Sequence, residues 1–304
     1  MYRYDSWMSY SYNGVEYGSK KLKDDKFTLN FNQKTIKPLP SYKDALLKNA
    51  IIMRDSFNEP FDLCLSGGTD SEIVVRVFKE LGITHNSFIF KCENDYNIRD
   101  VNYAISLCNE INIPYKIIDF NLEKFYENEA EILLKKTWIP AAGRLPRLKF
   151  IDYLDNIPIF CDGEPYYKRV LKEDYNTKSN WLFYLTEDAY SVSIYSRKIN
   201  RVIIGDWYEY IPEVMLSFLE IPYIKKLLND EIIGKTSTIS SKAIVHKEFY
   251  PSMKYKPKLV GYEGLNGQPG SRPDFINDFY NMYMSDIKNT TYTYSTDELE
   301  NLLL

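Results

Sequence analysis

This 304-residue sequence has few histidines and no closely spaced pair of cysteines. Its two histidines, His85 and His246, are too few for a Ser-His-Asp triad or a histidine-rich metal site, and we expect both to be surface or hydrogen-bonded residues. No Cys-x-x-Cys pair occurs, so there is no paired-cysteine motif for a metal or for redox chemistry. The scattered spacing instead predicts reduced core cysteines in a reducing compartment, namely Cys64, Cys92, Cys108 and Cys161.

Long hydrophobic runs and a strong net charge are also missing. No run approaches the length of a membrane span, and residues 1–6 lack an apolar signal core, so we expect a cytoplasmic protein with no membrane partner. The formal net charge is −4 at pH 7, which provides no global field to attract nucleic acid. A nucleic-acid partner would need a local basic patch and is not the expected one.

The most informative segment runs from an apolar strand through a glycine pair into a helix. Residues 61–65 have the composition of a buried strand, and apolar residues dominate the helix-length run 73–81. Gly67 and Gly68 therefore fall on a strand-to-helix turn. Glycine reaches positive φ at low cost and lets an anion approach the main chain, while a helix start offers free N–H groups and the positive end of a dipole. The segment predicts a phosphate-binding loop, with an ordinary tight turn as the alternative.

Side chains in the same loop indicate a metal–nucleotide complex. Ser66, Thr69 and Ser71 add hydroxyl donors, whereas the Asp70 carboxylate would repel a phosphate unless a hard cation such as Mg²⁺ bridges the two. A Walker loop is excluded because the only Gly-Lys-Thr, at 234–236, is not preceded by the required first glycine, and we interpret it as a helix end. ATP with Mg²⁺ is the expected ligand.

Strands and helices alternate beyond residue 41, which predicts an α/β fold, a parallel twisted sheet with helices on both faces. In such sheets ligands lie beyond the carboxyl ends of the strands, where the glycine loop is found. A first helix capped by Ser41 is expected to run to about Phe57. We expect strands at 61–65, 87–91, 114–120 and 157–160, and further helices at 73–81, 100–111, 122–136, 212–219 and 222–229.

Four regions follow from these patterns. A small β-hairpin region precedes the nucleotide-binding core, a helical C-terminal part completes the site, and a tail ends the chain. The regions are 1–40, 41–205, 206–285 and 286–304.

Two segments within these regions need separate mention. Residues 191–195 alternate like a strand, although a helix is possible. In the tail, a polar link at 289–294 is expected to precede a short helix opened by a capping box of Ser295 and Glu298.

Acidic residues follow the fourth expected strand. Asp162 and Glu164 lie just past its end, at the sheet edge where Asp70 is also expected. Either carboxylate is a candidate second ligand for the metal, and a solvated acidic turn is the alternative. The sequence does not decide between them.

The pattern Ser-Gly-Gly-x-Asp-Ser at 66–71 resembles the PP-loop ATP pyrophosphatase superfamily, a Rossmann-like group whose members cleave ATP to AMP and pyrophosphate. Within that superfamily the chain looks most like the synthetase domain of asparagine synthetases and β-lactam synthetases. That closer resemblance covers about 41–265 and adds two weaker patterns, the helix 100–108 and the segment Phe249-Tyr250-Pro251 with Lys256 to Tyr262.

The resemblance implies an AMP-forming carbon–nitrogen ligase that uses ATP and Mg²⁺. A small-molecule carboxylate would be adenylated and then attacked by ammonia or an amine. By resemblance, Asp70 and Lys258 are the catalytic residues, and Asp70 with Asp162 or Glu164 binds the metal. The expected ATP and pyrophosphate contacts are Leu65, Ser66, Gly67, Gly68, Thr69, Asp70, Ser71 and Phe90.

The chain departs from these relatives in two ways, and it also lacks a feature of other members of the superfamily. Position 2 is Tyr2 and the N-terminal region is short, so no glutaminase domain supplies ammonia. The fourth-strand loop Gly-x-Gly-Ser-Asp-Glu is reduced to Asp162-Gly163-Glu164. The paired cysteines of sulfur-transferring and deazaguanine-making members are absent.

Two further hypotheses remain open at this stage, and the sequence indicates no oligomeric state. The degraded fourth-strand loop is compatible with a nucleotide-binding regulatory or interaction protein. A nucleic-acid modification enzyme would need a local phosphate track, which could consist of Lys242, His246, Lys247, Lys254, Lys256 and Lys258.

Overall fold

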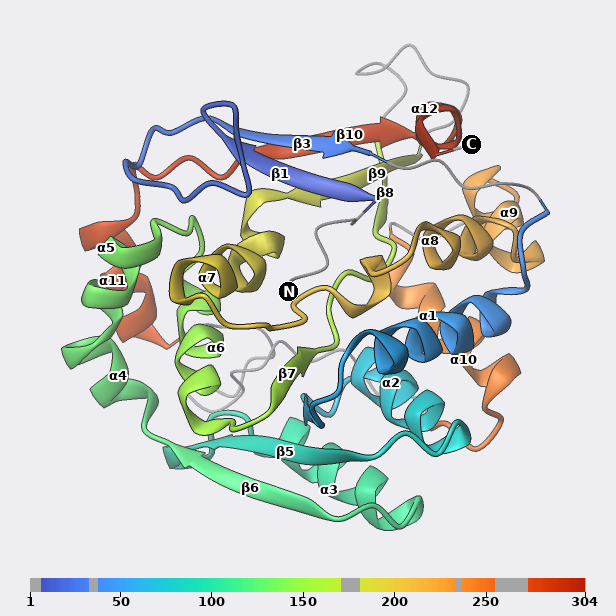
Figure 1. Ribbon diagram of the computed structural model, residues 1–304, viewed down its shortest axis with the longest axis horizontal. Helices are drawn as coiled ribbons and strands as arrows, with labels where there is room; N and C mark the ends of the chain where they lie inside the picture. The colour runs from blue at the N-terminus through green and yellow to red at the C-terminus, as the bar shows by residue number, and fades with distance from the viewer. Residues whose placement is uncertain (1–6, 33–37, 171–180, 233–236, 255–272, 304) are drawn as a thin grey trace.

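The computed structural model describes residues 7–32, 38–170, 181–232, 237–254 and 273–303. A parallel sheet and its helices occupy one half of the molecule, and antiparallel strands from both ends of the chain occupy the other (Figure 1). The expected α/β fold with a parallel sheet is confirmed. Lys258 and the Gly-Lys-Thr at 234–236 lie outside the described residues.

The parallel sheet consists of β4 (Phe61–Cys64), β5 (His85–Cys92), β6 (Tyr115–Phe120) and β7 (Ile157–Phe160), in the order β6-β5-β4-β7. Phe61 of β4 aligns with His85 of β5 on one side and with Ile157 of β7 on the other. The chain builds the sheet outward from β4 to β6 and then crosses to the other side of β4. The carboxyl ends of β4 and β7 therefore form a topological switch point, the place where open α/β sheets bind ligands.

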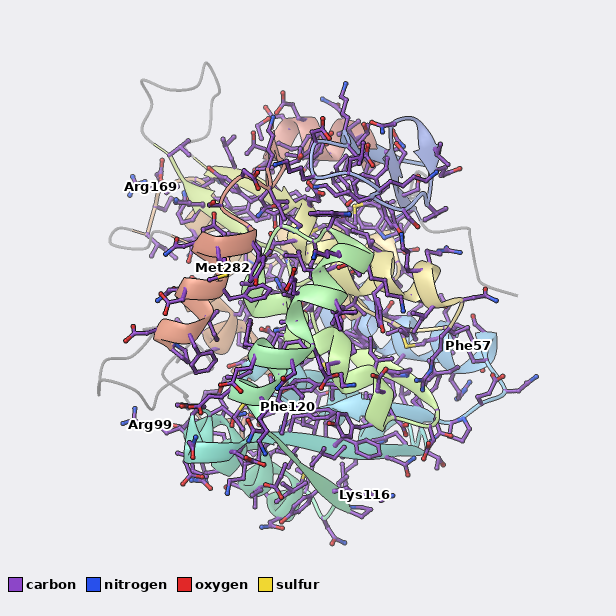
Figure 2. All side chains as sticks on the ribbon, turned by 90° about the vertical axis from the view of Figure 1, so that its left-hand side faces the viewer. Phe57, Arg99, Lys116, Phe120, Arg169 and Met282 are labelled. Atoms are coloured by element: carbon purple, nitrogen blue, oxygen red, sulfur yellow. The ribbon has the colours of Figure 1, made fainter. Side chains whose placement is uncertain are left out.

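Helices cover both faces of the sheet, as expected. Leu63 and Ile89 belong to a core cluster that includes residues of α2 and α3, whereas Phe90 and Phe120 belong to a second cluster with residues of α4, α5 and α6. Figure 2 shows Phe120 inside the molecule and Lys116 of the same edge strand at the periphery. The helices are α1 (Tyr42–Ser56), α2 (Thr69–Glu80), α3 (Ile98–Glu110), α4 (Leu122–Asn128), α5 (Ala130–Thr137), α6 (Leu145–Phe150), α7 (Ser191–Ile199), α8 (Pro212–Leu219), α9 (Pro222–Leu228), α10 (Ile239–Phe249), α11 (Asp274–Tyr283) and α12 (Thr296–Leu303), with 3₁₀ turns at Glu93–Asp95, Ala142–Arg144, Ile151–Tyr153, Glu187–Tyr190 and Trp207–Glu209.

The sequence predicted the first helix correctly, but it was less successful for two later segments. Ser41 caps α1 by accepting a hydrogen bond from the Asp44 N–H, as predicted. The single helix expected over 122–136 is wrong, because Glu129 leaves helical geometry and separates α4 from α5. Residues 191–195 lie in α7, so the helical alternative holds there.

The antiparallel half contains two three-stranded sheets. The N-terminal sheet has the order β2-β1-β3, and the second sheet has the order β10-β9-β8. The strands are β1 (Met8–Tyr12), β2 (Val15–Glu16), β3 (Phe27–Phe31), β8 (Tyr167–Arg169), β9 (Trp181–Thr186) and β10 (Thr291–Ser295). The polar link expected at 289–294 is therefore wrong over most of its length, since β10 pairs with β9 there. The capping box is confirmed, with Ser295 and Glu298 each accepting a backbone N–H from the other.

A buried ion pair connects the N-terminal region to the rest of the molecule. Lys20 lies 2.7 Å from the Glu187 carboxylate, and both side chains are almost fully buried. Tyr12 of β1 donates a hydrogen bond to the same carboxylate at 2.9 Å. The four cysteines are buried and free, as predicted. None of the described helices has the length and apolar character needed to cross a membrane.

Candidate functional site

The turn from β4 into α2 depends on one glycine in the left-handed region. Gly67 has φ +75°, and a Cβ at this position would lie 2.0 Å from the backbone oxygen of Asp100 in α3. Gly68 is the N-cap of α2 and no side chain caps the helix there; a Cβ on it would meet only Ser66 Oγ, at 3.4 Å. Gly67 thus lets the loop close against α3, and Gly68 leaves the helix start open to an anion.

Hydroxyl groups order the same turn. Ser66 Oγ accepts a hydrogen bond from the Gly68 N–H at 3.3 Å and lies 3.3 Å from Ser71 Oγ. Ser71 Oγ donates to the Gly68 carbonyl at 3.0 Å. Thr69 is the first residue of α2. The loop is therefore shaped by its own hydrogen bonds, with Ser66 exposed at its rim.

A buried lysine from α10 connects two of the predicted carboxylates. Lys242 Nζ lies 2.9 Å from Asp70 Oδ1 and 2.8 Å from Glu164 Oε1, and its side chain is only 3% exposed. Burial by itself would lower the pKa of Lys242, but the two carboxylates outweigh it and the pKa is raised. The Tyr208 hydroxyl fixes the same turn by donating to the Asp70 carbonyl at 3.0 Å. Asp70 and Glu164 thus form one site at the switch point.

The other acidic candidate has different partners. Asp162 accepts a hydrogen bond from Arg144 at 3.0 Å and a closer one from Arg147. Burial would raise the pKa of Asp162, but the two guanidinium groups outweigh burial and lower it. The sequence left Asp162 and Glu164 both open as the second metal ligand. In the structure Glu164 shares Lys242 with Asp70, whereas Asp162 is paired with Arg144 and Arg147.

His246 lies one helical turn beyond Lys242. We expected a surface or hydrogen-bonded histidine, and the structure differs on both points. Its ring is fully buried and neither nitrogen has a hydrogen-bond partner among the described residues. Burial and the Lys242 charge lower the pKa of His246 to about 3, so the ring is neutral. It stacks on Tyr42 with the ring centres 6.1 Å apart. The other histidine, His85, has Nδ1 3.0 Å from the Ile83 carbonyl.

Leu65 and Phe90, two of the expected ATP contacts, are both buried. The Leu65 N–H donates to the Phe88 carbonyl at 2.8 Å, just beyond the end of β4. The Phe90 ring stacks on Phe150 with the centres 4.0 Å apart, and the Phe90 carbonyl accepts a hydrogen bond from Asn97 at 2.8 Å. Both residues have packing roles, and their contact with a nucleotide stays a prediction.

The predicted phosphate track for nucleic acid does not form a surface. Lys242 and His246 are buried, whereas Lys247 and Lys254 are exposed. Lys256 and Lys258 lie outside the described residues. The track is therefore contradicted at two of its members, because a buried side chain cannot follow a phosphate backbone.

A magnesium ion at this site would depend on few protein ligands. Over the described ranges, no three His, Cys, Asp or Glu side chains gather as a metal-binding group. Mg²⁺ commonly takes one or two carboxylates together with water and substrate phosphates, so Asp70 and Glu164 fit that requirement. Lys242 now lies against both of these carboxylates.

Sequence reasoning missed the central position of Lys242. It carried no local motif and appeared only as one of several C-terminal lysines. Its contact with Asp70 joins residues 172 positions apart. The one available signal was chemical: a loop that holds a carboxylate and binds phosphate is expected to have a cation beside it. That expectation does not say which lysine supplies the cation.

No protein-family model matches the sequence, and no curated protein does so either. Two solved structures similar to this chain are an NMN synthetase from Francisella tularensis and an NH3-dependent NAD synthetase from Campylobacter jejuni subsp. jejuni NCTC 11168 in complex with the nitrate ion. The first shares 16% identity over 81% of this chain and 94% of that chain, with a TM-score of 0.31. The second shares 16% identity over 80% of this chain and 92% of that chain, with a TM-score of 0.33. At this level of similarity they do not bear on function, which is argued from the site alone.

Proposed function

We propose that this protein is an ATP-dependent ligase of the PP-loop type, which forms AMP and pyrophosphate while joining a carboxylate to ammonia or an amine. One observation carries the proposal. The Gly67–Gly68 turn at the start of α2 lies at the switch point of a parallel sheet, next to Asp70, Glu164 and a buried Lys242. Binding a nucleoside triphosphate requires backbone N–H groups that face the phosphates, carboxylates that hold a metal ion, and a fixed cation.

Each group has a distinct task in this proposal. The N–H groups of the first turn of α2 and the hydroxyls of Ser66 and Ser71 bind the β- and γ-phosphates, which leave as pyrophosphate. Asp70 and Glu164 would hold Mg²⁺, which neutralises phosphate charge when bound. Lys242 keeps these two carboxylates together before the metal–nucleotide complex arrives. Its ammonium is then free to turn toward the phosphates.

The proposed reaction has two steps. A carboxylate oxygen of the substrate attacks the α-phosphorus of ATP, the bond from that phosphorus to the bridging oxygen breaks, and pyrophosphate departs. The nitrogen of ammonia or an amine then attacks the acyl carbon, loses a proton, and AMP departs with the electron pair of the acyl–oxygen bond. A fixed cation beside the reacting groups lowers the barrier by offsetting the negative charge that develops. We assign this role to Lys242, with Lys258 remaining the second candidate.

The test is release of pyrophosphate from ATP and Mg²⁺ in the presence of ammonium and a panel of carboxylates. We expect Asp70→Asn and Lys242→Met each to lower the rate by roughly 10²-fold or more. Lys247→Met is the matched control, because Lys247 is an exposed lysine on the same helix. Equal rates in Lys242→Met and Lys247→Met would overturn the role of Lys242. No pyrophosphate release with any carboxylate would overturn the ligase.

A second candidate function has its own support. Because Lys242 already pairs with both Asp70 and Glu164, the protein can be stable without a metal and could bind a nucleotide without cleaving it. A nucleotide-binding regulatory protein of this kind would bind ATP with or without Mg²⁺ and release no pyrophosphate. Calorimetric titration of ATP beside the pyrophosphate assay separates it from the ligase.

A further inference from the structure

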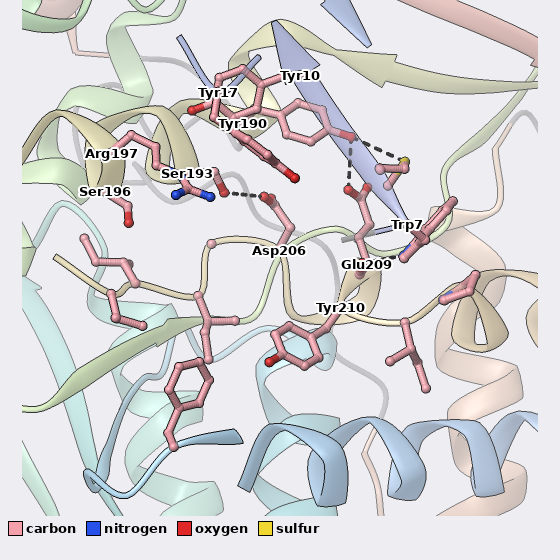
Figure 3. Close-up of a pocket in the computed structure, with 18 residues that line it drawn as sticks. Trp7, Tyr10, Tyr17, Tyr190, Ser193, Ser196, Arg197, Asp206, Glu209 and Tyr210 are labelled. Carbon is pink, nitrogen blue, oxygen red and sulfur yellow. Dashed lines mark hydrogen bonds between the residues drawn. The ribbon is translucent and has the colours of Figure 1, made fainter. Parts of the chain in front are cut away.

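A cavity of about 180 Å³ lies away from the glycine loop, between the N-terminal sheet, α7 and the segment that leads into α8 (Figure 3). Its walls are aromatic, and two carboxylates, from Asp206 and Glu209, line it. Arg197 also lines it, with its guanidinium 4.4 Å from the centre of the Tyr17 ring. The other aromatic side chains of the lining are Trp7, Tyr10, Phe57, Tyr190 and Tyr210.

Side-chain carbons of both acids pack around the open side of one glycine. Gly163, in the loop after β7, has φ +83°, and a Cβ there would lie 3.0 Å from Glu209 Cγ and 3.1 Å from Asp206 Cβ. The loop is held to this wall by the Tyr208 N–H, which donates to the Asp162 carbonyl at 3.2 Å. The Cys161–Glu164 loop therefore contacts the carboxylate wall of the cavity through Gly163 and belongs to the candidate nucleotide site through Glu164.

The partners of these carboxylates do not neutralise them. Asp206 Oδ2 accepts a hydrogen bond from Ser193 at 3.1 Å, while Asp206 Oδ1 is buried and has no hydrogen-bond partner in the described part of the chain. Glu209 is 7% exposed, and its carboxylate accepts a hydrogen bond from the Tyr190 hydroxyl at 3.2 Å. Hydroxyl donors satisfy lone pairs but supply no positive charge. A half-buried and a buried acid that line one cavity without an ion-pair partner among the described residues favour a cation brought by a ligand.

We propose that this cavity binds a small molecule that carries a primary ammonium group, held by Asp206 and Glu209. An ammonium group has three donors, enough to bind a carboxylate oxygen of Glu209 and one of Asp206 at the same time. The aromatic walls stabilise the cation further through their ring faces. The inference does not depend on the proposed function, since it concerns binding in the absence of ATP.

Two sources can supply this group, and Arg197 distinguishes them. In a zwitterionic amino acid the carboxylate would pair with Arg197 while the ammonium binds the two acids. A simple alkylamine would make only the second contact. The guanidinium of Arg197 points toward Ser193 and Asp206 in Figure 3, on the same side of the cavity.

The experiment is calorimetric titration of the full chain, without ATP, with n-butylamine, with L-alanine and with N-acetyl-L-alanine. We expect binding by at least one of the first two probes, no binding by the third, and a loss of at least about tenfold in affinity in Asp206→Asn and Glu209→Gln. Loss of L-alanine binding in Arg197→Gln, with n-butylamine unaffected, identifies the zwitterion. Binding of n-butylamine but not of L-alanine by the parent chain, unchanged in Arg197→Gln, identifies the amine.

Controls keep the test independent of folding. Asp24→Asn removes an exposed carboxylate elsewhere and should bind like the parent chain. Val202→Trp adds bulk to the cavity wall without replacing either acid, and we expect it to block binding. Unfolding curves for every variant establish that the fold persists. The proposal is overturned by failure of both ammonium probes to bind at millimolar concentration, or by binding that survives loss of both carboxylates.

Discussion

Two pairs of carboxylates lie next to each other at the Cys161–Glu164 loop, and they differ in their partners. Asp70 and Glu164 share the ammonium of Lys242, whereas Asp206 and Glu209 receive hydroxyl hydrogen bonds and have no ion-pair partner among the described residues. Burial and the nearby Asp162 raise the pKa of Asp206 to about 7, and burial raises that of Glu209 well above its ordinary range. In our proposals a metal ion takes the place of Lys242 at the first pair, and the ammonium group of a ligand binds the second pair.

The largest effect is expected from a glycine on each side of this comparison. Gly67→Ala should lower the free energy of unfolding by about 4 kcal/mol or more, because its Cβ would collide with the backbone oxygen of Asp100. Gly163→Ala has a similar positive φ, but its Cβ would meet side chains that can move, so we expect a smaller loss. Denaturant titration measures both. A larger loss in Gly163→Ala would show that the turn at Gly67 is not the more constrained one.

Removing the shared cation breaks the first pair. Lys242→Met should cost about 3 kcal/mol or more, because it leaves Asp70 and Glu164 without their common partner. Mg²⁺ should then raise the melting temperature of this variant more than that of the parent chain, since the metal no longer competes with an ammonium. Lys247→Met is the control. An equal Mg²⁺ response in all three proteins would contradict a metal site at these carboxylates.

Removing the charge of Asp206, in the second pair, should raise the free energy of unfolding rather than lower it. The folded chain keeps the Asp206 proton up to about pH 7, while the unfolded chain releases it near pH 3.8, so this group lowers stability as pH rises between these values. Asp206→Asn removes that dependence, and its stability relative to the parent should increase across the interval by up to about 1.4 kcal/mol per pH unit, then level off.

Unfolding curves at pH 4, 5.5, 7 and 8.5 measure this difference. The groups that act on Asp206 are Asp162, Ser193, Arg144 and Arg147, together with Glu209 of the same pair, and none of these residues is replaced in the variant. A stability difference that does not vary with pH would show that Asp206 is not a destabilising charge in the folded chain.

The smallest effect concerns single hydroxyls. Ser193→Ala removes a donor to Asp206, and Ser71→Ala removes a donor to the Gly68 carbonyl, and each should cost about 1 kcal/mol. Only the second should weaken ATP binding, because Ser71 belongs to the proposed phosphate loop. Comparable ATP affinities in the two variants would argue against that assignment.

The helix and strand pattern of the core could be predicted because its signals are local. Ser41, the apolar run 61–65 and the capping box at Ser295 act through neighbours within a few residues, and each is found where expected. The errors occur where distant contacts decide the outcome. Residues 291–295 are polar and lie next to a helix cap, yet they form a strand because β9 offers them an edge.

The candidate site divides in the same way. The sequence by itself determined the glycine turn, because φ +75° at Gly67 and an uncapped helix start at Gly68 are properties of adjacent residues. Only the tertiary structure decided which charges meet there. Strand order brings β7 beside β4, and with it Glu164 beside Asp70, while α10 brings Lys242 from 172 positions away. A carboxylate's partner depends on which elements pack together, and no local pattern of residues encodes that choice.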